Sequence, residues 1–360
     1  RFHPGKKIDY IDLSEYVSNI IPAENIVAKD SWNLTNEEST DILKLIEKET
    51  VSLEEIANCK QGIVTGLDKA FISTENEFKN LPKKIVKPWL KVGDIQKYAI
   101  EIVEERELVY TKLINSLDDY PQLKQRLLPY KPKLSNRREA KNGKIRWFDL
   151  QWPREQEFFE SEKLICRFKA SENTFCYDAN GFYSSADTTV VALNERGKKE
   201  FETKYLLALL NSKVLSFYFK SYGKLMDYRY EYYPGPVGRL RIKKTAKQKC
   251  YSTIVTYILF LKTQKLQTVS DQLIPTYFEQ IIDGMVYELY FPELLKKRNR
   301  EIIKYLGELP EFTEDMSDEQ KMQICKKVFD RLNDKEHPAR VNLEKMKEEI
   351  KEIRIIEGLE

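Results

Sequence analysis

The chain has 360 residues, 41% of them hydrophobic and 32% charged, which excludes a disordered protein and fits one large domain or about two to three smaller ones. No apolar run reaches the roughly twenty residues that cross a bilayer, and no signal peptide is recognisable, so we expect a cytoplasmic protein with no membrane partner. The five cysteines form no CxxC pair, and the two histidines offer little for a zinc site or a His-based triad.

The net charge of +3 is uninformative by itself, but the basic residues are unevenly distributed. Residues 129–148 and 213–249 are strongly basic, whereas the chain from residue 308 onward is rich in glutamate. This asymmetry is typical of a nucleic-acid-binding surface, although solvated lysine faces without a specific partner would give the same composition.

In chain order, residues 34–49 predict a first helix, with Ile42, Leu43 and Ile46 at helical spacing. From about residue 51 to 245, short β-favouring runs alternate with turn sequences. Strands are expected at 62–66, 84–90, 107–114, 163–168, 173–178 and 187–193, and helices within this region at 120–128 and 201–222.

After residue 250 every periodic segment predicts a helix: 253–267, 275–291, 294–309, 318–333 and 342–358. Pro275, Pro292, Pro310 and Pro338 are expected to separate these helices. The sequence therefore predicts an α+β protein, in which a strand-rich mixed α/β region precedes a helical C-terminal region. The predicted divisions are a lead-in at 1–50, a strand-rich domain at 51–249 and the helical region at 250–360.

Five segments follow one another in an informative order. They are QGIVTGLDKAFI (61–72), KKIVKPWLKVGDIQKY (83–98), residues 120–168, YLLALLNSKVLSFYFK (205–220), and a tail with MVYELYF (285–291) and residues 337–358. Together they resemble the TaqI-like C-terminal specificity domain of type IIG restriction-modification enzymes and adenine-specific DNA methyltransferases. Gly62 and Gly66 in the first segment suit tight turns that present a backbone edge.

The resemblance implies a sequence-specific recognition module for double-stranded DNA, with its target recognition domain at 51–249. It also implies a parent methyltransferase domain in cis, upstream of Arg1, which would use S-adenosylmethionine and could accompany an endonuclease. The chain itself has neither the glycine-rich cofactor loop nor the [DNS]PP[YFW] motif that clamps a flipped adenine. The nuclease-like tetrapeptide ESEK (160–163) lacks a preceding Pro-Asp, so we predict no catalytic, cofactor-binding or metal-binding residues here.

Residues 164–183 resemble a strand pair that the family would place in the major groove. Its polar residues near the bend are Arg167, Lys169, Ser171, Glu172 and Asn173. Arginine and lysine suit guanine, asparagine suits adenine, and glutamate accepts from cytosine, so these residues are candidates for base readout. Arg167 and Lys169 are expected to share one face, with Phe168 turned to the core. The alternative is that all five are ordinary polar residues of a hairpin.

Other basic residues are candidates for phosphate contacts, because lysines and arginines in polar loops position DNA without specifying sequence. They are Arg137, Arg138, Lys141 and Lys144 in a predicted polar loop, and Lys220, Lys224 and Arg229 in the second basic segment. Tyr228, Tyr230 and Tyr232 would share one face of an extended segment and could stack on bases, or they could face the core.

Two other functions remain open at this point. The helical tail could be the working part of a protein-interaction or assembly module, as in the specificity subunits of type I systems. An RNA-binding module is also possible, but the major groove of A-form RNA is too narrow for hairpin readout, so tyrosine stacking on single strands would have to dominate.

Overall fold

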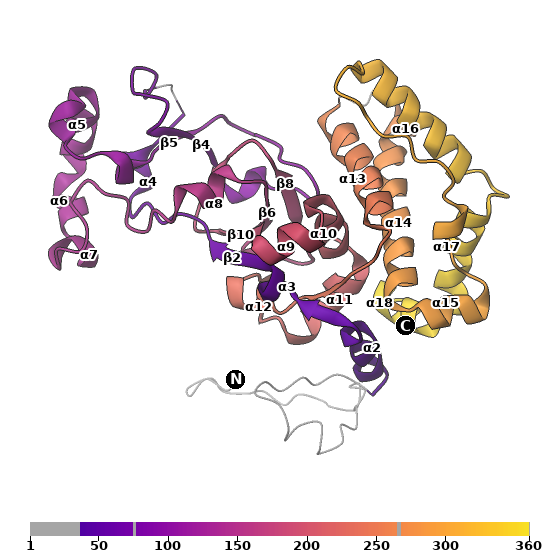
Figure 1. Cartoon of the computed structure of the whole chain (residues 1–360). Coiled ribbons are helices and arrows are strands. Elements are labelled where there is room, and N and C mark those ends of the chain that lie inside the picture. The colour runs from indigo at the N-terminus through magenta and orange to yellow at the C-terminus, as the bar shows by residue number, and fades with distance from the viewer. Residues whose placement is uncertain (1–36, 75–76, 265–267, 360) are drawn as a thin grey trace, which may run out of the picture.

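The computed structural model describes residues 37–74, 77–264 and 268–359 and confirms the predicted α+β class (Figure 1). A four-stranded antiparallel sheet has the order β2 (Ala57–Gln61), β10 (Thr188–Leu193), β6 (Lys163–Arg167) and β8 (Phe175–Asp178). Its register pairs Val191 with both Cys59 and Leu164. Three of the six predicted strands thus meet in one sheet.

Both faces of this sheet are covered, which explains why β10 is buried at every position. Because side chains alternate along a strand, Val190 and Ala192 belong to one hydrophobic core, and Val191 and Leu193 belong to another. We call the first the arm-side core and the second the helical core. The continuous apolar run of β10 therefore reflects burial on two sides.

The arm-side core lies between this sheet and a second one, of order β3 (Ile72–Ser73), β5 (Glu107–Val109), β4 (Val86–Leu90) and β9 (Tyr183–Ser184). Short helices complete it: α4 (Asp68–Phe71), α5 (Pro121–Leu127), α6 (Lys131–Ser135), α7 (Arg138–Lys141) and α8 (Gln156–Glu160), with 3-10 turns at 92–94, 111–113, 117–119 and 128–130. Figure 1 shows α5, α6 and α7 as a column at the opposite end of the molecule from the C-terminal helices. We call residues 121–149 the arm.

The helical core is formed on the other face of the first sheet. Its helices are α2 (Glu37–Glu47), α10 (Thr203–Leu210), α11 (Lys213–Tyr222), α13 (Gln248–Thr263), α14 (Val269–Tyr290), α15 (Pro292–Arg298), α16 (Asp318–Leu332), α17 (Pro338–Glu349) and α18 (Lys351–Glu357). Smaller elements are β1 (Thr50–Ser52) paired with β13 (Arg241–Lys243), α3 (Leu53–Ile56), α9 (Glu195–Glu200), α12 (Pro234–Gly238) and a 3-10 turn at 303–305. Ile46, Leu207 and Ile258 share this core, so it spans all three predicted divisions, whose boundaries stay a prediction.

Several predicted helices differ in their bounds. The helix predicted at 201–222 is broken between α10 and α11, because Ser212 caps α11 and the Asn211 side chain bonds the backbone of Phe175 on β8 (2.9 Å). Pro275 lies inside α14 rather than at its start. The segment predicted as one helix at 294–309 ends at Arg298, where Asn299 takes the left-handed conformation (φ 54°).

Candidate nucleic-acid interface

A third sheet, of order β11 (Leu225–Met226), β12 (Arg229–Glu231) and β7 (Lys169–Ala170), carries residues of both predicted DNA-contact segments. In its register, Lys169 lies opposite Glu231 and Ala170 opposite Tyr230. We call residues 224–233 the tyrosine hairpin. The polar segment at 167–173 and the tyrosines, which are about sixty residues apart in the sequence, are therefore neighbours in space.

The expected shared face of Arg167 and Lys169 is not formed. The chain bends at Phe168, so Arg167 ends β6 in the first sheet and Lys169 begins β7 in the third. Phe168 packs edge-on against the half-exposed ring of Tyr233, with ring centroids 4.3 Å apart, instead of turning into the core. A strand that changes sheets thus separates two side chains that strict alternation would align.

The Arg167 guanidinium is held in place by the loop that precedes Tyr98. Its Nε donates to the Ile95 carbonyl oxygen (2.6 Å), and its Nη2 donates to Gln96 Oε1 (2.8 Å). Sequence reasoning did not single out Gln96, although the motif GDIQKY contains it. Two short hydrogen bonds fix the direction in which the half-buried Arg167 points, which is the property that a base-reading arginine requires.

The remaining three readout candidates differ in exposure. Ser171 and Glu172 are exposed at the bend, whereas Asn173 is buried. The Asn173 side-chain nitrogen donates to the Leu210 carbonyl oxygen (2.6 Å), and its oxygen accepts from the Tyr232 hydroxyl (3.1 Å). The prediction that Asn173 contacts adenine is therefore wrong, because its side-chain amide is buried and hydrogen-bonded inside the protein.

The three tyrosines do not share one face as predicted. Tyr228 is 73% exposed at the hairpin turn, Tyr230 is half-buried, and Tyr232 is fully buried. Tyr232 stacks on Phe219 with ring centroids 4.1 Å apart, and burial raises the pKa of its hydroxyl far above the usual range. The alternative that the tyrosines face the core is thus correct for Tyr232, and of the three only Tyr228 is highly exposed.

Buried Glu231 organises the cations beside the hairpin. Lys224 Nζ lies 2.8 Å from one Glu231 carboxylate oxygen, and Lys169 Nζ lies 3.9 Å from the other. Arg229 places its guanidinium over the Tyr228 ring, 5.1 Å from the centroid. Lys220 is exposed at the end of α11.

The prediction of a polar loop is wrong for Arg138 and Lys141, which lie in α7, whereas Lys144 does lie in the turn that follows this helix. Arg137 is the first residue whose predicted role changes. Its guanidinium donates to four carbonyl oxygens, those of Leu134, Thr65, Trp147 and Asp149 (2.8–3.2 Å). Burial lowers its pKa, but an arginine remains protonated. Arg137 therefore joins the arm to the 62–66 segment and has little capacity left for a phosphate.

Gly66 is required beside Arg137. Its φ of 81° is left-handed, and a Cβ there would lie 2.8 Å from Arg137 Nη1. This outcome agrees with the expected tight turn at Gly66.

The other arm cations remain on the surface. Arg138 is highly exposed and pairs with buried Glu139 (3.0 Å), whose pKa is lowered first by a hydrogen bond from its own backbone N–H and then by Arg138. Lys141 and Lys144 are exposed, and within the described ranges neither lies in an ion pair. These three side chains are available to an anionic partner.

Backbone hydrogen bonds join the segments that lie between the hairpin and the arm. Phe168 N donates to the Asp187 carbonyl oxygen (2.9 Å), and Ile63 N donates to that of Ser184 (2.8 Å). Val64 and Trp152 then exchange two bonds (3.2 and 2.9 Å). Trp152, which sequence reasoning missed, is 43% exposed in these segments.

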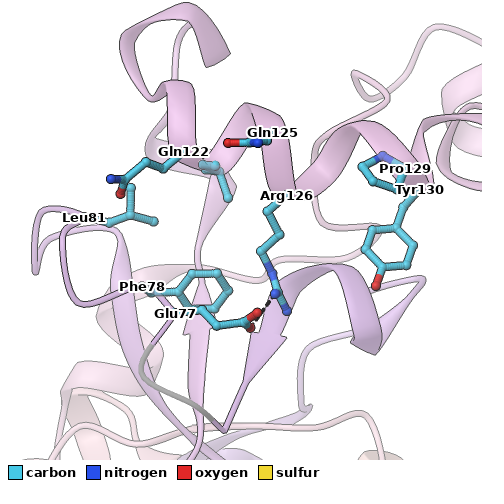
Figure 2. A pocket seen from close by; sticks show the side chains of 9 residues that line it. Glu77, Phe78, Leu81, Gln122, Gln125, Arg126, Pro129 and Tyr130 are labelled. Atoms are coloured by element: carbon cyan, nitrogen blue, oxygen red, sulfur yellow. Dashed lines mark hydrogen bonds and ion pairs between the residues drawn. The ribbon is translucent and has the colours of Figure 1, made fainter.

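A cavity of about 400 Å³ lies where the arm meets the rest of the molecule (Figure 2). Arg126 of α5 pairs there with Glu77, and Figure 2 shows the two side chains facing each other beside Phe78. Arg126 also donates to the Ile72 and Ala70 carbonyl oxygens (2.9 and 3.3 Å). These bonds anchor the arm, and the residues that line the cavity supply neither cysteine nor histidine.

No reactive cluster emerges elsewhere in the described residues. No group of three or more His, Cys, Asp or Glu side chains there could hold a metal ion. Lys163 of the ESEK tetrapeptide is fully buried against Asp178 (2.5 Å), and burial lowers its pKa. In the same part of the chain, no helix has the length and apolar character needed to span a membrane.

Part of the chain matches a known family. Residues 87–232 match the TaqI-like C-terminal specificity domain. The chain is 24% identical over 307 residues to the type II methyltransferase M.BstVI of Geobacillus stearothermophilus, covering 81% of this chain and 49% of that protein. It is 29% identical over 126 residues to the type II methyltransferase M.MjaIV of Methanocaldococcus jannaschii, covering 33% and 42%. The chain thus matches less than half the length of each relative.

Two solved structures are also similar. The type IIL restriction-modification enzyme MmeI, solved in complex with DNA, has a TM-score of 0.49 at 13% identity, covering 78% of this chain and 36% of that one. The type IIG restriction endonuclease BpuSI has a TM-score of 0.43 at 13% identity, covering 73% and 34%.

Proposed function

We propose that the chain recognises a specific sequence in double-stranded DNA, because residues 87–232 match the TaqI-like C-terminal specificity domain. The carrying observation is that the matched span contains the arm, the Arg167 site and nearly all of the tyrosine hairpin. The exposed cations of the arm and of the hairpin lie in this same segment of the chain, and we propose that one duplex contacts both.

Which basic residues contact phosphates and which read bases follows from how firmly each side chain is held. Arg138, Lys141 and Lys144 are exposed, and such side chains neutralise phosphates without reading sequence. Arg167 is fixed by Ile95 and Gln96, so it can present a defined pair of donors to a base edge. Lys169, Ser171 and Glu172 extend this readout site.

The parent protein would be a cytoplasmic adenine-specific methyltransferase or type IIG enzyme. Its relatives are named as type II methyltransferases, which supports a catalytic domain in cis that binds S-adenosylmethionine and flips the target base. The chain described here would find and hold the site. Calorimetric titration should therefore detect no S-adenosylmethionine binding by this chain alone, and micromolar affinity would contradict that division.

The proposed function is tested by the salt dependence of duplex binding. If about five to eight phosphates are neutralised, affinity should fall roughly a hundredfold or more between about 50 and 200 mM salt. A random-sequence duplex pool, selected on the purified chain, should converge on one motif. A flat salt response without convergence would favour the assembly-module alternative, and preference for single-stranded RNA would favour the third.

A further inference from the structure

The turn of the tyrosine hairpin exposes an unusual set of apolar side chains. Leu225 is 53% exposed, Met226 39% and Tyr228 73%, and all three lie within four residues of each other. Single exposed apolar residues are normal, but a contiguous exposed group marks an interaction site. Leu225 and Met226 form β11 and Tyr228 lies in the turn that follows, so the three make one exposed apolar group.

The base of the hairpin is rigid while its turn is exposed. Glu231 N donates to the Lys224 carbonyl oxygen (3.0 Å), and Tyr232 N donates to that of Phe168 (2.8 Å). The Tyr232 carbonyl oxygen accepts from the Thr189 hydroxyl on β10 (2.6 Å). The turn is therefore held in position before any partner binds, which lowers the entropic cost of inserting it.

The charges around the turn indicate what covers it. Lys224 and Arg229 flank the apolar group, and Arg229 Nε is buried without an acceptor in the described part of the chain. The exposed carboxylate is Asp227, whose φ of 59° forms the turn. Phosphates would repel Asp227 if the turn lay along the backbone. Base amino groups inside a groove would instead donate to it.

A partner with anionic edges and an apolar interior is duplex DNA, whose phosphates lie outside its base stack. Resting on the proposed function, we propose that the turn of the tyrosine hairpin is a wedge that enters the duplex. Leu225, Met226 and Tyr228 contact opened base steps, Lys224 and Arg229 contact the flanking phosphates, and Asp227 accepts from a base amino group. Apolar wedges of this kind unstack a step and kink the helix.

The test uses the full chain and the duplex selected on it from a random pool, with 2-aminopurine placed at successive positions. Binding should raise the fluorescence at one or two adjacent positions, because a wedge unstacks the probe. Tyr228→Ala should abolish this rise and weaken binding roughly five- to hundredfold, the range for loss of one stacked base. Its slope of affinity against salt should stay unchanged, since no charge is removed.

Tyr305→Ala is the matched control, because Tyr305 is another exposed tyrosine with a cation over its ring, Lys304 at 5.2 Å. It lies outside the matched domain and should leave binding and fluorescence unchanged. If the unsubstituted chain binds the duplex but fluorescence rises at no position and Tyr228→Ala binds normally, the wedge proposal is wrong and DNA recognition stands. If the unsubstituted chain binds no duplex, the proposed function itself fails.

Discussion

The arm and the tyrosine hairpin both carry basic side chains but hold them differently. In the arm, Lys141 ends α7 and Lys144 lies in the turn that follows, and neither has a carboxylate partner in the described ranges. In the hairpin, Lys224 and Lys169 converge on buried Glu231, and Arg229 rests on Tyr228. Exposed, unpaired cations neutralise the phosphates of any sequence, whereas a cation held in one direction can meet a defined atom of its partner. The comparison teaches that the count of basic residues does not separate positioning from recognition.

The largest effect is expected on stability, from Arg137 in the arm, and the adjacent Arg138 provides the contrast. Arg137→Ala removes a guanidinium bonded to four carbonyl oxygens and should lower the free energy of unfolding by about 2–3 kcal/mol. Arg138→Ala removes an exposed side chain and should change it by no more than about 0.5 kcal/mol. Urea unfolding of both variants measures the difference. Equal destabilisation would mean that the arm does not depend on Arg137.

The readout site should give the next effect. Arg167→Ala and Lys169→Ala should each narrow the gap in binding free energy between the selected duplex and a scrambled one by about 1–3 kcal/mol. Binding to the scrambled duplex should change little. Gln96→Ala should reproduce part of the Arg167 effect, because Gln96 Oε1 holds one end of that guanidinium. Equal weakening on both duplexes would remove these residues from base readout.

The parts of the fold that could be predicted from the sequence are those set by interactions between residues close together in the chain. The strands at 163–168, 173–178 and 187–193 were predicted correctly because their alternation and turns are local signals. The helical tail was predicted for the same reason, although its breaks at Asn299 and Ile350 were not. The resemblance to the family was predicted from segments in a characteristic order, and the match of residues 87–232 to the TaqI-like C-terminal specificity domain confirms that resemblance.

The candidate site could be predicted only in part, because exposure is a property of packing. The period of two that grouped Tyr228 with Tyr232 assumed a continuous strand, but the chain turns at Asp227. Likewise, asparagine and arginine usually lie on the surface, yet the side chains of Asn173 and Arg137 donate to carbonyl oxygens of residues distant in the sequence, Leu210 and Thr65. No local pattern encodes such partners.

Arm phosphate contacts should give a smaller effect than readout contacts. Arg138→Ala and Lys144→Ala should each weaken selected and scrambled duplexes equally and reduce the slope of log affinity against log salt by roughly one. Fluorescence anisotropy at two or more salt concentrations measures both quantities. If either variant no longer distinguished the selected duplex from the scrambled one, the arm would read bases, and the contrast with the hairpin would be wrong.

The smallest energetic effect is expected from Trp147, which nevertheless locates the duplex. Trp147 is half-buried in the arm beneath Lys131, whose Nζ lies 5.4 Å from the ring centroid, and the tyrosine hairpin contains no tryptophan. A duplex that contacts the arm should displace that lysine and change the tryptophan emission. Trp147→Phe should bind with nearly unchanged affinity, since an aromatic ring remains, but should lose most of the emission change. Trp152→Phe is the control for the segments between the hairpin and the arm. If the emission change survives both substitutions together, the duplex does not reach the arm, and the hairpin side alone forms the interface.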